Sequence, residues 1–596
     1  MKMRVATAIA KFLEAAGTEY LFGYNGHGNW ALLDAFTYET KVKGIACRSE
    51  DQAIHMADGY WRMKRKPPMA LVATSVGPGN SNVTSAIANA FFESSALMVL
   101  AGAGSTQWAD RGGIEEFYRY APDEWILSLK PMVKKAVVVN RPDTALETII
   151  RAYKTAITGR PGPVVVQIPF DIQHTEVEIH QLPDPQQWLK VSPPAPDPEA
   201  IARAAELLAS AERPLIVVGS GIHNAQAWGE LQALAETFDL PVEMTPTGKG
   251  SLPEDHPLCL GSVGRAGTGH GNQAAQECDV LLGIGTHFSD IDTGGWTLHK
   301  IPSGTKLVHI DVDASEIARV YPTEAGIVSD ARLALQALHT ALAKRQRKSH
   351  QPWLSQIAQW RKQWEQEVAP QITSNLSPLH YARIIHDASQ VIQRIDPQAS
   401  LLFDTGHALS FGPPFLNTQS RYVAHCGFYH RMGWSLPSAL GAKLARPDHA
   451  AVVFMGDGAF LMTGTTLATA TEYGIPLTVV VFNNRSLQIE RELMTKIYGR
   501  HSFCDYKIQS TGELWNPDLV KWAESMDACA RRISRPEEIG PAVQDAMNSK
   551  RPFVIDAATN LEIAGYRSVW YPYPRDFADN PPGAYGLLTR TEEKVK

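Results

Sequence analysis

Short apolar runs alternate with stretches of helical periodicity along most of the chain. The runs are rich in β-branched residues and are followed by Gly, Asp or Asn, as in PLIVVGSG, KLVHIDVD, AAVVFMGDG and PLTVVVFNN. Apolar strands that alternate with helices are typical of parallel sheets covered by helices on both faces. We therefore predict an α/β fold with mostly parallel sheets, and we expect ligands to bind at the carboxyl ends of the strands.

Two stretches lack this alternation and divide the chain. One is rich in proline and polar residues at 182–198, and the other is charged and rich in Gln and Trp from about 344 to 378. A chain of 596 residues is too long for a single hydrophobic core. We predict three domains, each with its own sheet, at 1–180, 190–345 and 375–560. An aromatic, proline-bounded tail at 561–596 could cover a functional site or a subunit surface, or pack on the outside.

Composition excludes several classes of partner. The net charge of −6 and the 20% of charged residues are ordinary for a globular protein, so nothing indicates nucleic acid or a membrane surface. Val5, Ile9, Phe12 and Ala16 share one face at helical spacing, which predicts the first helix of a folded domain instead of a leader peptide. The six cysteines are scattered and lack metal-ligand spacing, which favours reduced thiols and a cytoplasmic protein.

Two polar positions follow neighbouring apolar runs in the last third of the chain. Asp457 ends one predicted strand within MGDGAF, and Asn484 ends the next, after a crossover helix predicted at Thr465–Tyr473. A right-handed β-α-β unit brings both strand ends to one edge of the sheet. Their oxygens, with the backbone carbonyl of Ser486, form a half-shell that suits Mg²⁺. Taken singly, the Asp could equally cap a helix and the paired Asn form a turn.

The glycines beside Asp457 allow phosphate to approach the backbone closely. Gly456 and Gly458 have no side chain to keep an anion away. The N–H groups that follow belong to the start of a helix, which attracts negative charge. We therefore expect phosphate groups to contact the chain at Gly456, Gly458, Ala459 and Phe460.

The GDG…NN pair resembles the diphosphate-binding signature of thiamine-diphosphate (ThDP) enzymes. CRSEDQAIHMADGYWR, with the MALVATSVGPGNSNVTSAIANAFFESSALMVLAG segment that follows it, is similar to the pyrimidine-binding domain of the acetolactate synthase family. The resemblance covers residues 1 to about 558 and implies pyrimidine-binding, central and diphosphate-binding domains in that order. It also implies that Glu50 is the acid that activates ThDP at its aminopyrimidine. The enzyme would be a homodimer or homotetramer with active sites between subunits.

The resemblance implies further cofactor contacts. HRMGWSLPSALGAKLARP is similar to the segment that props the cofactor into its bent shape, which assigns Met432 and the carbonyl of His430 to the aminopyrimidine. DTGHALSF takes the place of a loop that touches the diphosphate, which makes Gly406 and His407 candidates. The glycine-rich loops of the middle domain stand where the family binds FAD. GSGIHN lacks the third glycine of a dinucleotide fingerprint, so FAD or another adenine nucleotide stays open there.

Four positions depart from acetolactate synthases where that family binds its substrate. His27 replaces a glycine, Glu115 replaces a glutamine, Glu490 replaces an apolar residue, and Leu493 replaces a tryptophan. A histidine and extra acids near the reacting carbon suit proton transfer or the positioning of water. We therefore assign catalytic roles to His27 and Glu115 besides Glu50.

The resemblance implies a reaction that breaks or forms a C–C bond beside a carbonyl through a ThDP enamine. The substrate is a small carbonyl compound, and the family favours decarboxylation or carboligation of a 2-oxo acid. The departures leave open the hydrolytic cleavage of a 1,2-dione, as in cyclohexane-1,2-dione hydrolase. A non-catalytic nucleotide-binding protein would not need Glu50, and a flavin or nicotinamide oxidoreductase would need a better fingerprint than GSGIHN.

Overall fold

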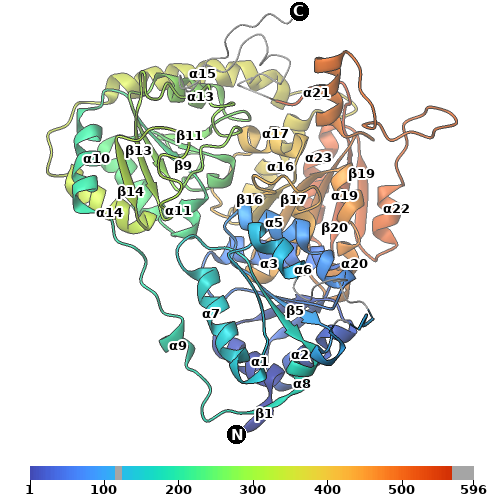
Figure 1. Cartoon of the computed structure of the whole chain (residues 1–596). Coiled ribbons are helices and arrows are strands. Elements are labelled where there is room, and N and C mark those ends of the chain that lie inside the picture. Colours follow the sequence, from blue (N-terminus) through green and yellow to red (C-terminus); the bar gives the residue numbers. More distant parts are fainter. Residues whose placement is uncertain (110, 115–123, 567–596) are drawn as a thin grey trace, which may run out of the picture.

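The computed structural model describes residues 1–109, 111–114 and 124–566. Three six-stranded sheets, each covered by helices, confirm the predicted α/β fold with three domains (Figure 1). A separate antiparallel pair joins β1 (Lys2–Arg4) to β8 (Glu176–Glu178). The three sheets lie within 1–180, 190–345 and 375–560, and the exact boundaries between the domains stay a prediction.

The first domain has the strand order β3-β2-β4-β5-β7-β6, with parallel pairing throughout. Its strands are β2 (Tyr20–Gly23), β3 (Lys43–Ala46), β4 (Leu71–Thr74), β5 (Met98–Ala103), β6 (Lys135–Val138) and β7 (Val164–Pro169). Its main helices are α1 (Val5–Ala15), α2 (Trp30–Glu39), α3 (Glu50–Lys64), α5 (Thr84–Phe92) and α7 (Ala145–Ile157). Val5, Ile9 and Phe12 of α1 are buried, which confirms the predicted first helix.

The second domain has the strand order β11-β10-β9-β12-β13-β14, again parallel. Its strands are β9 (Pro214–Val218), β10 (Val242–Met244), β11 (Cys259–Ser262), β12 (Val280–Ile284), β13 (Lys306–Asp311) and β14 (Ala325–Val328). Its helices include α10 (Pro198–Ser210), α11 (Ser220–Asn224), α12 (Trp228–Phe238), α13 (Gly269–Glu277) and α14 (Ala331–Leu342). The long helix α15 (Gln351–Ile372) then connects this domain to the third, packing on α13.

The third domain has the strand order β16-β15-β17-β18-β20-β19, also parallel. Its strands are β15 (Ser400–Phe403), β16 (Val423–His425), β17 (Ala451–Gly456), β18 (Thr478–Asn483), β19 (Cys529–Ile533) and β20 (Phe553–Ala558). Its main helices are α16 (Tyr381–Ile395), α17 (His407–Phe415), α18 (Ser435–Ala445), α21 (Gln488–Tyr498) and α23 (Ile539–Asn548). The predicted crossover between β17 and β18 is present as two short helices, α19 (Asp457–Thr463) and α20 (Thr466–Glu472), so helix begins directly at the acid.

The first and third domains are joined by close packing of α3 against α18. Two glycines permit this approach. A Cβ atom at Gly59 would overlap with the backbone of Ser438, and one at Gly441 would overlap with the backbone of Met56. Because protein interiors are close-packed, neither backbone can move aside without disturbing the helix pair.

We expect Gly59→Ala to lower the free energy of unfolding by about 1–3 kcal/mol, since it overpacks this helix contact. The matched control is Gly229→Ala in α12, where a Cβ would meet nothing within 4 Å. There the same substitution should raise stability by about 0.5–1 kcal/mol. Chemical denaturation of both variants tests the prediction, and equal effects of the two substitutions would contradict it.

The core of the second domain contains a buried acid on β10. Glu243 has no exposed surface, and within the described part of the chain neither carboxyl oxygen has a hydrogen-bond partner. Burial raises the pKa of this carboxyl well above its usual range. The folded protein therefore holds Glu243 neutral, whereas the unfolded chain ionises it at an ordinary pH.

Because the folded-state pKa of Glu243 is raised, this residue makes the protein less stable as the pH rises. The unfolded chain loses the proton first, so stability falls by about 1.4 kcal/mol per pH unit between the unfolded and folded pKa values. We expect Glu243→Gln to reduce the difference in unfolding free energy between about pH 5 and about pH 8. Denaturation at both pH values measures it, with the exposed Glu206→Gln as control; an unchanged difference would refute the assignment.

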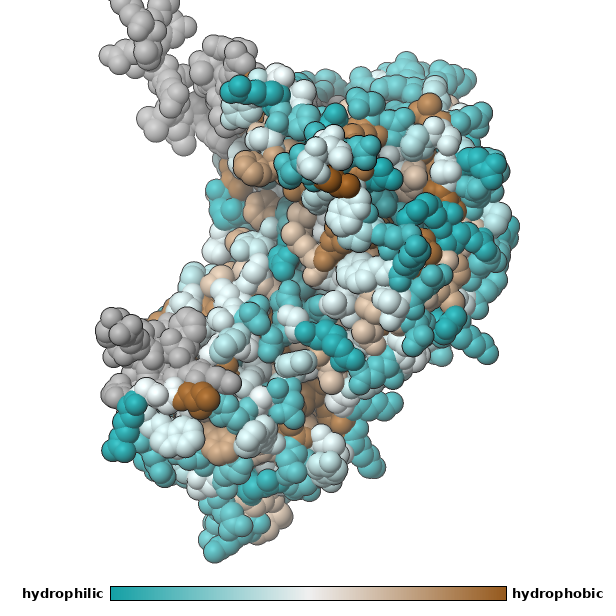
Figure 2. Space-filling model, turned by 90° about the vertical axis from the view of Figure 1, so that its right-hand side faces the viewer, coloured by the Kyte–Doolittle hydropathy of each residue, from teal (hydrophilic) through white to brown (hydrophobic). Residues whose placement is uncertain are grey.

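No helix among the described residues combines the length and apolarity needed to cross a bilayer. Figure 2 shows a face on which hydrophilic residues predominate and hydrophobic ones lie in small, separated groups.

Candidate active site

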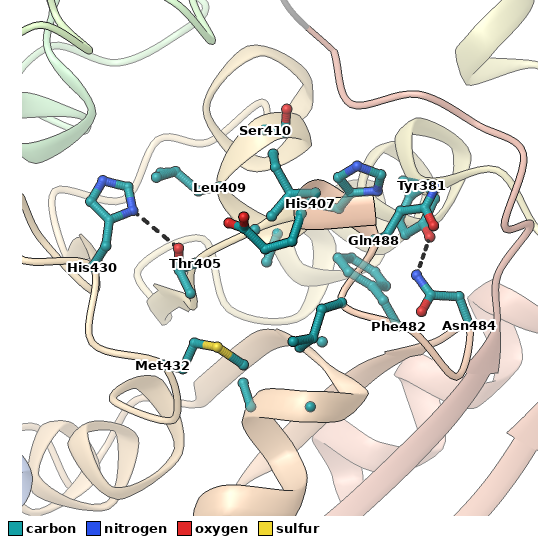
Figure 3. A pocket seen from close by; sticks show the side chains of 18 of the residues that line it. Tyr381, Thr405, His407, Leu409, Ser410, His430, Met432, Phe482, Asn484 and Gln488 are labelled. Atoms are coloured by element: carbon teal, nitrogen blue, oxygen red, sulfur yellow. Dashed lines mark hydrogen bonds between the residues drawn. The ribbon is translucent and has the colours of Figure 1, made fainter. Parts of the chain in front are cut away.

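A cavity of about 530 Å³ lies at the carboxyl edge of the third sheet (Figure 3). The ends of β15, β17 and β18 meet here, as expected for a parallel sheet in which neighbouring strands end at the same edge. Most of the residues predicted for cofactor and metal line this cavity: Gly406, His407, His430, Met432, Gly456, Asp457, Gly458, Ala459, Asn484 and Ser486. Phe460 does not, because its ring is buried against Trp522; the predicted role of its backbone N–H stays a prediction.

Asp457 is the first residue of α19 and is only 2% exposed. One carboxylate oxygen accepts the N–H of Gly458 at 2.8 Å, and the other accepts the N–H of Arg485 at 2.6 Å and the side-chain amide of Asn516 at 2.8 Å. All three donors are neutral. Burial raises the pKa of Asp457 to about 6, and a divalent cation would favour its charged form.

Asn484 is oriented by two hydrogen bonds. Its amide nitrogen donates to the hydroxyl of Tyr381 at 2.7 Å (Figure 3). Its amide oxygen accepts the N–H of Ser486 at 2.8 Å. Arg485 between them has φ of +62°, which makes the turn tight. Asp457, Asn484 and the Ser486 backbone therefore offer the oxygen-only donor set that Mg²⁺ prefers.

The glycines at the strand ends leave space on the cavity side. A Cβ at Gly456 would meet nothing within 4 Å, and one at Gly406 would meet only Ile489 at 3.8 Å. At Gly458 a Cβ would instead contact the hydroxyl of Tyr506 at 2.5 Å, so the chain has no room for a side chain there. This open cradle beside a buried carboxylate and a helix N-terminus fits a diphosphate group bound with its metal.

His430 and Met432 face the cavity from the loop after β16. His430 has φ of +55°, and its Nδ1 lies 3.0 Å from the hydroxyl of Thr405 (Figure 3). The methyl group of Met432 lies near Gly458, where a Cβ would be 3.3 Å away. Both residues thus line the same cavity as the glycines, and their contact with the aminopyrimidine stays a prediction.

His407 is buried at the start of α17, with its Nε2 atom 3.6 Å from the carboxylate of Glu492 on α21. The segment 560–566, here called the C-terminal segment, lies beside this pair. Gln488 donates to the carbonyl of Leu561 at 2.5 Å, and Glu492 accepts the N–H of Gly565 at 2.7 Å. Ser410 and Trp364 bind Tyr566, each at 2.8 Å. The start of the predicted tail therefore lies at the cavity rim, whereas Trp570, Tyr571 and Tyr573 lie outside the described residues.

Family models match all three domains. The thiamine pyrophosphate enzyme N-terminal TPP binding domain matches residues 3–121, the central domain matches 201–338, and the C-terminal TPP binding domain matches 405–557. The chain belongs to the thiamine pyrophosphate enzyme family. Thiamine pyrophosphate is another name for ThDP, so the resemblance drawn from the sequence is confirmed.

Relatives of this thiamine pyrophosphate enzyme match it over most of its length. A probable acetolactate synthase large subunit of Methanocaldococcus jannaschii is 34% identical over 93% of this chain and 91% of its own. The acetolactate synthase large subunit of Corynebacterium glutamicum is 31% identical over 93% of this chain and 86% of its own. A glyoxylate carboligase of Escherichia coli O157:H7 is 31% identical over 91% of this chain and 90% of its own.

Glu50 and His27, two of the three predicted catalytic residues of this thiamine pyrophosphate enzyme, do not line the cavity. Glu50 begins α3, is 7% exposed, and accepts the side-chain amide of Asn82 at 3.0 Å. It does not line the cavity at Asp457. His27 follows β2 at the carboxyl edge of the first sheet, with its ring against Trp30. Glu115 lies outside the described residues.

A second cavity, of about 650 Å³, lies at the carboxyl ends of β9, β12 and β13 in the central domain. Gly221 and Gly285 line it and touch one another so closely that neither tolerates a Cβ. Asp311 follows at the end of β13, and burial raises its pKa. Arg265, which the sequence places in the same group of glycine-rich loops, lines the first cavity instead.

Sequence reasoning missed two residues that orient polar groups at this thiamine pyrophosphate enzyme's first cavity. Tyr381 orients Asn484, and Asn516 holds both Asp457 and, at 3.1 Å, the side chain of Asn483. Neither belongs to a motif. The aromatic residue at the start of an amphipathic helix and the loop asparagine become functional only through the tertiary fold.

Proposed function

We propose that this enzyme binds ThDP with Mg²⁺ in the cavity at Asp457 and forms or breaks a C–C bond beside the carbonyl of a small 2-oxo acid. The observation that carries this proposal is the buried carboxylate of Asp457, which has only neutral hydrogen-bond donors and lies beside Gly456, where the cavity side of the backbone is open. A metal diphosphate supplies the missing positive charge and fills that space.

The residues of the proposed site have different roles toward the bound cofactor. When bound, ThDP supplies a nucleophilic carbon and accepts the electrons of the bond that breaks beside the carbonyl. Asp457, Asn484 and the Ser486 carbonyl would hold Mg²⁺, and Gly406 and His407 would lie beside the diphosphate. Glu50 would hold the proton at the aminopyrimidine ring, since a carboxylate can exchange it reversibly.

The names of the relatives support carboligation as the outcome. Synthase and carboligase are names of enzymes that join two molecules. Two acetolactate synthases and one glyoxylate carboligase each match about nine tenths of this chain. His27 and Glu115 are proposed to transfer protons or position water near the reacting carbon, since imidazole and carboxylate side chains can both serve as general acids and bases.

We propose that a second subunit completes the site. Glu50 lies at the first sheet and does not line the Asp457 cavity of its own chain, while α3 is held against α18 of the same chain. A homodimer or homotetramer would place Glu50 of one chain over Asp457 of another. Sedimentation should therefore show at least a dimer at concentrations that support activity, and a fully active monomer would contradict this.

We propose that the central cavity binds FAD or another adenine nucleotide. Its glycine-lined strand ends let a diphosphate approach the backbone, and Asp311 at the end of β13 can accept hydrogen bonds from a ribose. Denaturing the purified protein and analysing the released small molecules by absorbance and mass will identify the nucleotide. The proposal is contradicted if the denatured protein releases no nucleotide and the folded protein binds neither added FAD nor added ADP.

We further propose a cytoplasmic location. All six cysteines are free thiols, and Cys47, Cys259, Cys278, Cys426 and Cys504 are buried, which suits a reducing compartment.

The function is tested with a substrate panel. The protein is loaded with ThDP and Mg²⁺, incubated with 2-oxo acids and 1,2-diones with and without an acceptor aldehyde, and the products are identified by mass. We expect release of CO₂ from a 2-oxo acid and a new hydroxyketone when an acceptor is present. Free acids formed from a 1,2-dione without any carboligation product would contradict the proposal and favour hydrolysis.

A further inference from the structure

A buried cluster of the first domain reaches into the third domain beside the cofactor cavity. Its centre is Arg62 on α3, which is 4% exposed. Arg62 donates two hydrogen bonds to Asp58, at 2.7 and 2.9 Å, and one to the backbone carbonyl of His425 at 2.7 Å. Its guanidinium lies 4.5 Å from the ring of Trp434, whose indole N–H also donates to Asp58 at 2.7 Å.

Glu93 is the second anchor of this cluster. It follows α5 at 4% exposure and accepts the backbone N–H of Phe428 at 2.6 Å. Its other carboxylate oxygen lies 3.7 Å from Arg62, which Glu93 therefore shares with Asp58. Gly427 lies against the side chain of Glu93, so closely that a Cβ atom at Gly427 would overlap with it. Gly427 also has φ of +85°.

One segment of the third domain is held against the first domain by several contacts. Arg431 within it pairs with Asp51 at 3.2 Å. The buried cluster binds the same segment at His425, at Phe428 and at Trp434. Between the last two anchors lie His430 and Met432, which line the cavity. The segment has positive φ at Gly427, His430 and Gly433. A non-glycine residue such as His430 keeps this conformation only where its surroundings impose it.

We propose that Glu93 is a positioning residue, which fixes the segment 425–434 so that Met432 and the backbone carbonyl of His430 face the aminopyrimidine half of bound ThDP. The inference rests on the proposed function. It makes the geometry of the cofactor site in the third domain depend on a carboxylate of the first domain in the same chain. Glu50 would arrive from another chain, so both chains would shape each site.

The test uses three substitutions at Glu93 and one control. Glu93→Ala removes the acceptor for the Phe428 N–H. Glu93→Asp keeps the charge beside Arg62 but withdraws the acceptor by one methylene group. Glu93→Gln keeps an oxygen acceptor at full length. The control is Glu472→Ala, which breaks an exposed ion pair between the same two domains, 2.6 Å from Arg48.

Two properties of the protein with ThDP and Mg²⁺ are measured besides activity. They are the dissociation constant of ThDP and the near-ultraviolet circular dichroism of the bound aminopyrimidine. We expect Glu93→Ala and Glu93→Asp to weaken ThDP binding at least about tenfold and to change the dichroism, because a small misplacement of binding groups has effects of this size. Glu93→Gln should stay within about threefold of the unsubstituted protein, and Glu472→Ala should match it.

The outcomes separate this inference from the proposed function. If the unsubstituted protein does not bind ThDP, the proposed function fails. If it binds ThDP, and Glu93→Asp binds it equally with unchanged dichroism, the positioning role fails whatever happens to the melting temperature. Should Glu93→Ala not fold, Glu93→Asp and Glu93→Gln still decide the question, because they differ only in charge and in reach.

Discussion

Replacing Glu50 by Gln is expected to slow exchange of the C2 proton of bound ThDP by about 10²- to 10⁴-fold, the usual contribution of a general acid–base group. In the unsubstituted protein the side-chain amide of Asn82 donates to the Glu50 carboxylate at 3.0 Å. The amide oxygen of Gln can accept the same hydrogen bond, so the local structure should persist. It cannot exchange a proton with the aminopyrimidine. ThDP binding should therefore remain close to normal, and quenched-flow exchange followed by NMR measures the rate.

The matched control for this prediction is Glu39→Gln in the same domain. Glu39 pairs with Arg4 at 2.7 Å and lies on α2, not at the start of α3. Its substitution should leave the exchange rate unchanged. Exchange at the normal rate in Glu50→Gln would show that another group activates the cofactor.

Asp457→Ala should abolish Mg²⁺-dependent binding of ThDP, with a loss of at least about a hundredfold in affinity. This carboxylate is the charged member of the proposed oxygen donor set, since Asn484 and the Ser486 carbonyl are neutral. Removing it leaves two neutral oxygens, which cannot balance a divalent cation in a buried site. Titration with ThDP at several Mg²⁺ concentrations, followed by tryptophan fluorescence, gives the affinity and its metal dependence.

Asp396→Asn controls for the loss of a hydrogen-bonded carboxylate in the same domain. Asp396 precedes β15 at the amino edge of the sheet, where it accepts the N–H of Ala450 at 2.8 Å and lies 3.1 Å from the ring of His449. Its substitution should lower stability without altering the Mg²⁺ dependence. If Asp457→Ala also binds ThDP in a normal Mg²⁺-dependent way, the proposed metal site is wrong.

The architecture could be predicted because each buried strand is a short β-branched run that ends in Gly, Asp or Asn. That pattern follows from burial on both faces of a parallel sheet, which leaves polar residues only at strand ends. It placed Asp457 and Asn484 at neighbouring ends, and the structure brings both to one cavity. Local periodicity and sheet topology were sufficient for this part of the site.

Other parts of the site depend on contacts that no local pattern encodes. Asn516 reaches Asp457 from a distant loop, and Arg265 crosses from the second domain to the first cavity. The separation of Glu50 from that cavity follows from the packing of α3 on α18, which is set by backbone contacts at two glycines. Glycines of this kind have no signature in sequence, because their neighbours are fixed only when the domains dock.

The C-terminal segment has a practical consequence for handling the enzyme. Gln488, Glu492 and Ser410 hold it at the rim of the cavity, so cutting the chain back into this segment would remove contacts beside the site. The amino group of Met1 instead binds the carbonyl of Ile179 at 2.8 Å, at the far end of the molecule from α17 and α21 (Figure 1). Affinity tags, and tethers for attaching the enzyme to a solid support, therefore belong at the N-terminus.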